Sequence, residues 1–406
     1  MRHPHVSIIM PIRNEAAYIV GCLNSVLSQD YPVDRMEILI ADGMSNDNTR
    51  LIIRKISEGI QVPVIIIDKP SRIVATGMNL AIRRAKGDII VRVDGHTSIE
   101  PDYVRRCVET IKRTQADNAG GLMNAVGSNL FGRAVALGTS TPFGIGGARF
   151  HYSDKEEWVD TVYMGAWPRD VFQRVGMFDE EMIRNQDDEF NYRLRKAGGR
   201  IFLSPKIKST YNVRSTLPAL WRQYFQYGFW KVRVLQKLPG QMSARQFAPP
   251  TLALALLFSS FLAWSSFLLP SSVISRLPVL VVRLPFSFFT PMTPVALSPT
   301  SVLLLLSLVV PSLYLFANLS ASGFIAAKKG FRYYPILPFV FATLHIGYGM
   351  GFLAGLLKFW NRWGQRGREI ASTTGKTEHA PASRAAEVAR DHPAGRSRRC
   401  GESCDR

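Results

Sequence analysis

The sequence predicts an α/β domain with a doubly wound, mostly parallel sheet, followed by transmembrane α-helices. In the first quarter of the chain, short apolar β-rich runs alternate with helical segments, a rhythm typical of parallel sheets with helices on both faces. From Pro249 to Trp360 charged residues nearly vanish, as expected of a segment within a bilayer. The predicted strands are 6–12, 36–42, 62–68 and 88–94, and the predicted helices between them are 16–29, 49–58 and 74–86.

Residues at the ends of these elements support the assignment. VSIIMPI and MEILIAD are continuous apolar runs, as expected for strands buried on both faces. Asn14 can cap the first helix and Asp47 the second, and Gly87 closes the third. The glycine-rich segments between Gly120 and Phe150 are interpreted as flexible loops around an active site.

The chain divides into three predicted parts: a cytosolic domain over 1–240, a membrane region over 247–360 and a disordered basic tail over 361–406. The membrane region holds three apolar stretches near the roughly 20 residues that cross a bilayer, at 250–269, 300–319 and 334–359. A fourth stretch at 273–289 contains arginines and prolines. Three spans place the tail outside the cell and four place it inside, so the side of the tail stays open.

The net charge of +19, from 50 Lys and Arg against 31 Asp and Glu, favours an anionic membrane surface as the partner. Basic residues gather beside the first apolar stretch and in the tail, so nucleic acid is not expected as a partner. The four cysteines show neither a disulfide framework nor zinc-site spacing. The first apolar run is too short for a signal peptide, and the front domain is therefore expected in the cytosol.

Polar side chains follow the predicted strands at the edge where parallel sheets bind ligands. Glu15, Asp42 and Asp94 make this edge acidic, which suits a phosphate ligand if a cation mediates. Asp94 and His96, two residues apart in a turn, can face one hard divalent ion such as Mg²⁺ or Mn²⁺. The alternative is an ordinary surface turn, because Asp and Gly are common turn residues. Asp42 can also accept a hydrogen bond from a pyrimidine or a ribose.

A second acidic group, Gln186-Asp187-Asp188-Glu189, precedes an amphipathic helix. The helix dipole stabilises carboxylates there, and one of them can accept a proton from a sugar hydroxyl. The alternative is an acidic helix start without a catalytic role. Further along, a belt of aromatic and amide side chains suits sugar binding, but equally an interfacial helix that leads into the first span. The belt consists of Trp221, Gln223, Tyr224, Phe225, Gln226, Tyr227, Phe229 and Trp230.

The order of these motifs resembles the inverting family 2 glycosyltransferases, which have the Rossmann-like GT-A fold. The motifs are PIRNE, ADGMSNDNT, RVDGH and NQDDEFNYRLRKAGGRI, and the resemblance is close over residues 6–231. STPFGIGGARF, MGAWPRDVF and VGMFDEEM are similar to the succinoglycan-biosynthesis branch of the family. Two positions depart from the family pattern: His96 replaces the second Asp of the DXD metal motif, and Gln186 replaces a Glu.

The resemblance implies a role for several candidate residues. Asp187 would be the general base, and Asp94 and His96 would hold Mg²⁺ or Mn²⁺. The nucleotide-sugar site would be lined by Pro11, Glu15, Asp42, Asn79 and Asp94. Beyond what the resemblance implies, the candidates for acceptor contact or a helper role are Asp188, Glu189, Trp167, Gln226 and Trp230.

The activity that the resemblance implies is inverting transfer of a sugar, glucose from UDP-glucose, to a lipid-linked or saccharide acceptor in exopolysaccharide or cell-envelope glycan synthesis. The enzyme would be a multi-pass protein of the cell membrane. Three alternatives stay open: a processive polysaccharide synthase, a non-catalytic membrane scaffold and a nucleotidyltransferase. Gln226 and Trp230 only hint at the processive QxxRW motif, and the sequence has no Gly-rich basic loop near its N-terminus to bind a triphosphate.

Overall fold

The computed structural model describes residues 3–268, 280–284 and 293–363 of the 406-residue chain. The strands are β1 (Val6–Ile12), β2 (Met36–Asp42), β3 (Val64–Asp68), β4 (Ile89–Arg92), β5 (Thr97–Ile99), β6 (Asn118–Val126), β7 (Glu157–Val159), β8 (Tyr163–Pro168), β9 (Ile201–Asn212), β10 (Leu280–Leu284) and β11 (Thr293–Leu297). The helices are α1 (Ile19–Leu27), α2 (Thr49–Ser57), α3 (Val74–Arg84), α4 (Tyr103–Thr114), α5 (Leu130–Thr139), α6 (Pro142–Ile145), α7 (Val171–Val175), α8 (Gln186–Lys196), α9 (Leu217–Lys237), α10 (Ala248–Leu268), α12 (Pro299–Lys329) and α13 (Leu337–Lys358).

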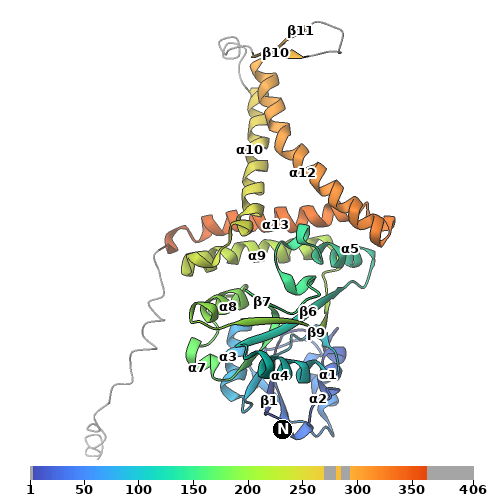
Figure 1. Cartoon of the computed structure of the whole chain (residues 1–406), viewed down its shortest axis with the longest axis vertical. Coiled ribbons are helices and arrows are strands. Elements are labelled where there is room, and N and C mark those ends of the chain that lie inside the picture. The colour runs from blue at the N-terminus through green and yellow to red at the C-terminus, as the bar shows by residue number, and fades with distance from the viewer. Residues whose placement is uncertain (1–2, 269–279, 285–292, 364–406) are drawn as a thin grey trace, which may run out of the picture. The chain divides into compact units, whose positions relative to one another are not determined.

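One sheet of mixed direction forms the core of the front domain, in the order β3-β2-β1-β4-β8-β6-β9-β5 with β7 paired to β9. β3, β2, β1 and β4 run parallel; Ile12 lies beside Asp42 at the carboxyl ends of β1 and β2, and Ile9 in the middle of β1 lies beside Arg92 at the end of β4. β8 joins β4 in the antiparallel direction, and the remaining strands pair in both directions. The predicted fold class is confirmed, because this α/β domain begins with a parallel half-sheet and is followed by apolar helices (Figure 1).

The mixed half of the sheet includes residues that the sequence analysis interpreted as a flexible loop. Gly120 and Gly121 lie inside β6, and a Cβ on Gly121 would overlap the carbonyl oxygen of Ile207 in the neighbouring β9. The two strands approach too closely there for a side chain. These two glycines therefore serve strand packing, and the loop interpretation is wrong for them because composition does not reveal a close strand contact.

The loops after β1 and β2 are tied to one another by polar side chains. Asn14 accepts a hydrogen bond from the Asn46 backbone amide at 3.0 Å, and α1 begins only several residues later. Asp47 accepts one from the Thr49 amide at 3.0 Å and one from the Ala16 amide at 3.2 Å. The predicted cap at Asn14 is thus wrong, because its side chain joins the two loops instead. Asp47 serves both the start of α2 and the loop after β1.

Two hydrophobic layers cover the two faces of the sheet. All residues of β1 and β2 are buried, as predicted for strands covered on both faces. Helices α1, α2 and α4 cover one face, where Ile8 and Val104 belong to one cluster. Helices α3, α7 and α8 cover the other, where Ile9, Met78 and Phe190 belong to a second cluster. Because packing fixes the strands from both sides, the side chains at their carboxyl ends are held in a defined arrangement.

Three helices of the rear half are long and apolar enough to cross a membrane: Ala244–Leu268, Pro299–Lys329 and Leu337–Lys358. They overlap the three predicted spans. The fourth predicted stretch, 273–289, is described only at β10, which pairs antiparallel with β11. Residues 280–284 therefore form a strand and not part of a helical span, since LVVRL with its two valines favours a strand; the rest of the stretch lies outside the described residues. The predicted tail lies outside the described residues beyond Trp363.

Helices α9 and α13 pack with almost no space between their backbones (Figure 1). A Cβ on Gly351 of α13 would overlap the carbonyl oxygen of Phe225 in α9, and a Cβ on Gly228 of α9 would overlap that of Tyr348 in α13. The substitution Gly351→Ala should therefore push the helices apart. We expect a loss of about 2 kcal/mol of stability, a usual value for overpacking, measured as a lower thermal midpoint in detergent.

The matched control is Gly323→Ala. Gly323 also lies in an apolar helix, but the nearest atom to an added Cβ is 3.7 Å away, on Tyr334. This variant should keep its midpoint or gain slightly, because Ala favours a helix more than Gly does. Equal midpoints for the two variants would contradict the close backbone contact of α9 and α13.

Candidate active site

The carboxyl edge of the sheet opens into a cavity of about 1210 Å³ that also reaches the apolar helices. Its sheet-edge wall includes Pro11, Glu15, Lys69, Asp94 and His96. Its helical wall includes Asp187, Asp188, Gln226, Lys231, Leu252 and Tyr314, from α8, α9, α10 and α12. Ten Lys and Arg side chains but five Asp and Glu side chains line the cavity as a whole. The cavity therefore favours anionic ligands.

Arg92 and Glu15 hold the Asp94-Gly95-His96 turn in place. Arg92 donates from Nε to Asp94 Oδ1 at 2.7 Å and from Nη2 to Oδ2 at 3.1 Å. His96 Nδ1 lies 3.1 Å from Glu15 Oε1. A Cβ on Gly95 would lie 3.0 Å from Glu15 Cγ, so only glycine fits comfortably between the two loops. The turn is thus packed against the loop after β1, unlike an ordinary surface turn.

The same turn was predicted to hold a divalent ion. Within residues 3–268, 280–284 and 293–363, no three His, Cys, Asp or Glu side chains converge on a site that could hold a metal. Asp94 and His96 supply one carboxylate and one imidazole. Mg²⁺ in nucleotide-dependent enzymes is commonly held by one or two carboxylates together with substrate phosphates. Both side chains line the cavity, so an ion held by them would take its further ligands from the phosphates of a bound substrate.

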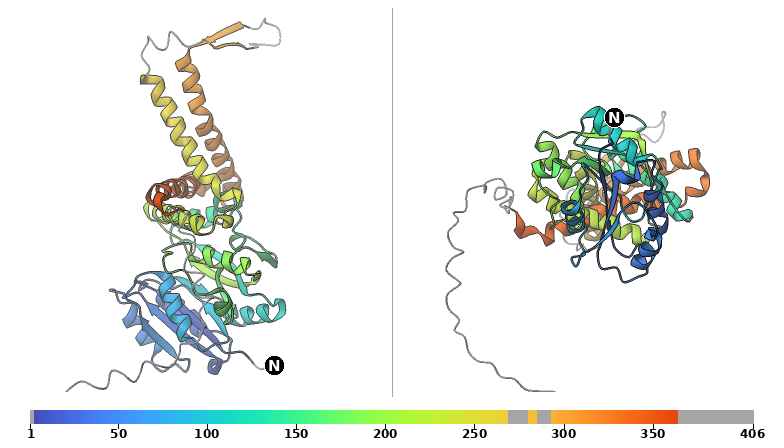
Figure 2. Two further views of the ribbon diagram at one scale, coloured as in Figure 1. Left: turned by 90° about the vertical axis from the view of Figure 1, so that its left-hand side faces the viewer. Right: turned by 90° about the horizontal axis from the view of Figure 1, so that it is seen from below.

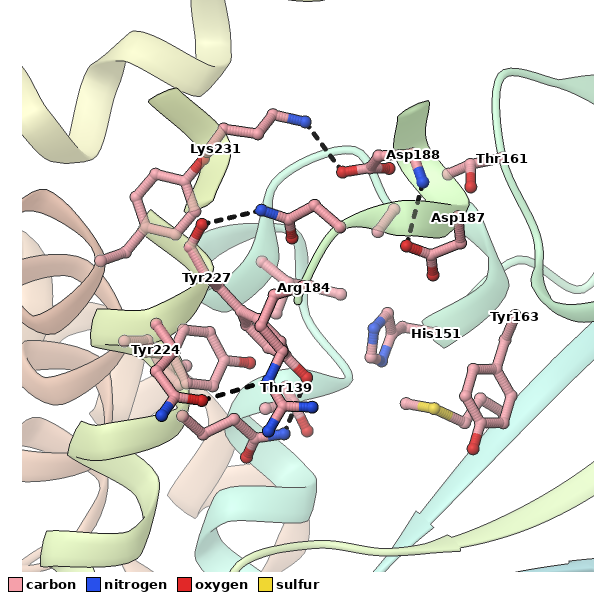
Figure 3. Close-up of a pocket in the computed structure, with 18 of the residues that line it drawn as sticks. Thr139, His151, Thr161, Tyr163, Arg184, Asp187, Asp188, Tyr224, Tyr227 and Lys231 are labelled. Atoms are coloured by element: carbon pink, nitrogen blue, oxygen red, sulfur yellow. Dashed lines mark hydrogen bonds and ion pairs between the residues drawn. The ribbon is translucent and has the colours of Figure 1, made fainter. Parts of the chain in front are cut away.

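Asp187 and Asp188 lie side by side at the start of α8 (Figure 3). Asp187 Oδ1 accepts a hydrogen bond from the Asp188 amide at 2.9 Å. Asp188 Oδ2 lies 2.8 Å from Nζ of Lys231, whose side chain is only 2% exposed. Burial raises the pKa of Asp187, the charge of Asp188 raises it further, and the Arg92 guanidinium opposes both. A carboxylate with a raised pKa is suited to accept a proton near neutral pH.

Two residues that were expected to line the nucleotide-sugar site, Asp42 and Asn79, do not line the cavity. Asp42 is fully buried and accepts a hydrogen bond from Ser45 Oγ at 2.5 Å. Asn79 is also buried; its amide donates to the Phe178 carbonyl oxygen at 2.9 Å and accepts from the Phe178 amide at 3.0 Å. Neither side chain lines the cavity, because the polar atoms of both are used to hold neighbouring segments.

Three of the five predicted acceptor residues are also used in packing. Trp167 is 2% exposed and lies edge-on to Phe190 in the core. Glu189 is buried and pairs with Arg193 at 2.5 Å. Trp230 packs against the end of α13. The side chains of these three are absent from the cavity wall, so the structure does not bring them together with the candidate base. Asp188 and Gln226 do line it.

Several cavity residues escaped the sequence analysis. Burial lowers the pKa of Lys69 to about 8, and its Nζ donates to a backbone carbonyl at 2.7 Å. Arg184 donates from Nε to Gln226 Oε1 at 3.1 Å. Lys69 directly follows the predicted strand 62–68, so the pattern of polar residues after strands does mark its position, whereas no pattern marks Arg184 in its loop. Arg92 could have been found, because strand alternation places it on the same face as Asp94.

The fold and the site together define a glycosyltransferase of the GT-A type. A Rossmann-like half-sheet carries a packed Asp-Gly-His turn at its carboxyl edge, and a carboxylate pair lines the same cavity. Residues 7–176 match the model of the family described as "Glycosyl transferase family 2". The chain belongs to this family.

Related proteins agree with this assignment. "Succinoglycan biosynthesis protein ExoA" of Rhizobium meliloti (strain 1021) is 31% identical over 258 residues, which cover 63% of this chain and 77% of that protein. "Dolichyl N-acetyl-alpha-D-glucosaminyl phosphate 3-beta-D-2,3-diacetamido-2,3-dideoxy-beta-D-glucuronosyltransferase" of Methanococcus voltae is 31% identical over 239 residues, 57% of this chain and 74% of that protein. The chain is therefore a glycosyltransferase of glycan biosynthesis.

A solved structure shows the same fold. The mannosyltransferase PcManGT from Pyrobaculum calidifontis, in complex with GDP-Man and Mn²⁺, aligns with a TM-score of 0.50 at 16% identity. The alignment covers 87% of this chain and 88% of that chain. At this identity the likeness supports the architecture alone.

Proposed function

We propose that the protein is an inverting glycosyltransferase that moves a sugar from a nucleotide-sugar donor to a lipid-linked saccharide at the cell membrane. The observation that carries the proposal is one cavity lined by Asp94 and His96 at the sheet edge, Asp187 on α8, and Leu252 and Tyr314 on apolar helices. Donor, base and lipid-borne acceptor can meet there. The catalytic domain then lies in the cytosol, where nucleotide sugars are supplied.

The proposed donor is UDP-glucose. Glucose rests on the resemblance to the succinoglycan-biosynthesis branch, and the excess of Lys and Arg around the cavity suits a nucleoside diphosphate. The solved mannosyltransferase of this fold holds GDP-Man with Mn²⁺. By analogy we propose that Asp94 and His96 hold Mg²⁺ or Mn²⁺ here. When bound, that ion supplies Lewis-acid stabilisation of the departing diphosphate.

Asp187 acts as the general base in the proposed mechanism. Its carboxylate takes the proton of an acceptor hydroxyl, whose oxygen attacks the anomeric carbon from the face opposite the diphosphate. The bond from the anomeric carbon to the diphosphate oxygen breaks, and its electron pair leaves with the nucleoside diphosphate. One displacement therefore inverts the anomeric configuration. Lys231 holds Asp188 beside the base through the 2.8 Å contact.

The mechanism predicts how the rate depends on pH. Only ionised Asp187 accepts a proton, so the rate should fall as pH is lowered through its raised pKa. Asp188→Asn removes a negative charge that raises this pKa and leaves the Lys231 ammonium nearby. The loss of the Asp188 charge and the remaining Lys231 ammonium both favour the ionised form of Asp187. The acidic limb of kcat/KM against pH should therefore move to lower pH.

The control for this prediction is Asp170→Asn. Asp170 is 59% exposed and lies outside the cavity wall, so the acidic limb should stay in place. If the acidic limb of the kcat/KM profile moved to higher pH in Asp188→Asn, that result would contradict the electrostatic coupling of Asp187 and Asp188.

The proposed function is tested with membranes that contain the full chain and a panel of labelled sugar nucleotides. UDP-glucose should add one sugar to a lipid-extractable acceptor and release a nucleoside diphosphate. Long product chains would support the processive synthase instead, and release of pyrophosphate would support the nucleotidyltransferase. Absence of transfer from every donor by a folded chain would overturn the proposal.

A further inference from the structure

We infer that α13 lies along the membrane surface beside α9, and that only α10 and α12 cross the bilayer. All three apolar helices are long enough to span, but they differ in their surroundings. In the most apolar window of each, 11% of the residues of the first and second helices are buried, against 50% for α13. A helix surrounded by lipid is expected to leave its surface exposed, whereas half of the α13 window is buried against other parts of this chain.

The neighbour that encloses α13 most extensively is α9. Gly347 of α13 lies against Trp221 of α9, and Gly351 lies against Phe225. Four residues further on, Gly355 lies against Phe229 of α9, so the two helices run side by side in the same direction. Figure 2 shows the same pairing from another side. Beyond the last of these contacts, Gln236 Nε2 donates to the Phe359 carbonyl oxygen at 2.7 Å. The position of α9 therefore fixes the depth of α13.

Charged side chains on α9 exclude this helix from the hydrocarbon core of a bilayer. Lys231 pairs with Asp188 at 2.8 Å, and Arg233 pairs with Glu181 at 2.8 Å. Both carboxylates belong to the segment that carries the candidate base Asp187. If α13 crossed the membrane, α9 and these ion pairs would have to cross with it, at a cost of several kcal/mol for each charge. The α9–α13 pair thus remains level with the catalytic domain.

Helices α10 and α12 differ from α9 in the side chains that they expose. Their exposed side chains are large and apolar, and they include Leu254, Leu257, Phe258, Phe261, Trp264, Phe267, Leu304, Leu305, Leu306, Leu308, Leu313, Leu315 and Phe316. The two spans contain 25 and 31 residues. At 1.5 Å per residue they reach about 37 Å and 46 Å, more than the ~30 Å hydrocarbon core. They form the part of the chain that suits a crossing.

The exposed surface of the α9–α13 pair and the residues that flank it suit the lipid–water interface. Trp221 is 40% exposed, Phe339 64%, Phe331 73% and Trp360 72%. An apolar groove lined by Leu217, Pro218, Trp221, Phe339, Ala342, Thr343 and Ile346 runs between the two helices. Lys328, Lys329, Arg332, Lys358 and Arg362 lie near the ends of α12 and α13. Aromatic rings and basic side chains are the groups enriched at the interface.

A chain that crosses the bilayer twice has a different topology from a chain that crosses it three times. With two crossings, the α12–α13 connection and the end of α13 both lie on the side of the catalytic domain, together with the basic residues between and after the helices. This arrangement obeys the positive-inside rule without conflict. It also places the part of the cavity wall formed by Leu252 and Tyr314 next to the interface, where a lipid-linked acceptor presents its saccharide.

The test is side-specific labelling of single cysteines in the full chain, with Cys22, Cys107, Cys400 and Cys404 replaced by alanine. Lys155→Cys marks the catalytic domain, and Ser298→Cys marks the far end of α12. Lys329→Cys and Asn361→Cys mark the two ends of α13. A membrane-impermeant maleimide is applied to intact cells and to inside-out vesicles, and denaturation in detergent confirms that each thiol can react.

We expect Lys329→Cys and Asn361→Cys to react from the same side as Lys155→Cys, and Ser298→Cys to react from the opposite side. Reaction of Asn361→Cys from the side opposite to Lys329→Cys would overturn the inference, because α13 would then cross. Phe331→Cys and Trp363→Cys form a second pair with the same expectation, should one of the first variants fail to accumulate. The readout is independent of sugar transfer, so it separates this inference from the proposed function.

Discussion

Asp187→Asn is expected to slow sugar transfer by roughly 10²- to 10⁴-fold, the usual contribution of a general base. The amide has nearly the shape of the carboxylate but does not accept a proton from the acceptor hydroxyl. Its oxygen can still accept the hydrogen bond that the Asp188 amide donates at 2.9 Å. Local structure at the start of α8 should therefore persist. The measurement is kcat for transfer from saturating donor.

The same variant should be at least as stable as the wild type. Burial and Asp188 raise the pKa of Asp187, so the folded state favours the protonated side chain and this contribution is lost as pH rises through the raised pKa. At neutral pH the ionised carboxylate therefore destabilises the fold, and Asn removes that charge. The thermal midpoint should stay equal or rise.

Asp154→Asn provides the matched control, because Asp154 is exposed and lies outside the cavity wall. This variant should keep both the wild-type rate and the wild-type midpoint. Full activity in Asp187→Asn would remove Asp187 from the role of base. Loss of activity together with a much lower midpoint would instead assign it a structural role.

Glu181→Gln is expected to cost about 3 kcal/mol of stability. Glu181 pairs with Arg233 at 2.8 Å, with Lys237 at 2.7 Å and with Arg362 at 3.1 Å. The Arg233 side chain is 2% exposed and would be left with Gln236 as a hydrogen-bond partner. Breaking a buried ion pair costs about 3–5 kcal/mol, and the 36% exposure of Glu181 favours the lower end. The thermal midpoint in detergent measures the loss.

The control for Glu181 is a surface ion pair. Asp34 lies 3.5 Å from Arg35 and is 75% exposed, so Asp34→Asn should cost less than about 0.5 kcal/mol. If Glu181→Gln and Asp34→Asn gave the same thermal midpoint, the ion pairs between α9 and the segment before α8 would contribute nothing measurable to the stability of the fold.

The parallel half of the sheet could be predicted from the sequence because its signals are local. β1 and β2 are continuous apolar runs, and burial on both faces produces such runs directly. Polar residues that directly follow parallel strands also lie together at the carboxyl edge of the sheet, and this holds whatever the rest of the fold is. Glu15, Asp94 and His96 were therefore placed at one site, and the structure brings all three to the cavity.

The acceptor side could not be predicted in the same way, because it depends on contacts between distant segments. Trp167 and Glu189 have residue types that suit sugar binding, but the fold buries both among partners that the sequence does not reveal. Similarly, the hydropathy of α13 is that of a span, and only its contacts with α9 show that it is enclosed. Hydropathy reports whether a helix is apolar and not which apolar surroundings it has.

A single displacement at the anomeric carbon, with Asp187 as the base, inverts the configuration of the transferred sugar. The most direct test is the anomeric configuration of the product formed from an α-linked UDP-sugar, determined by NMR on the transferred residue. The mechanism predicts a β-linked product. An α-linked product would contradict it, because retention requires either a covalent intermediate or attack from the face of the leaving diphosphate.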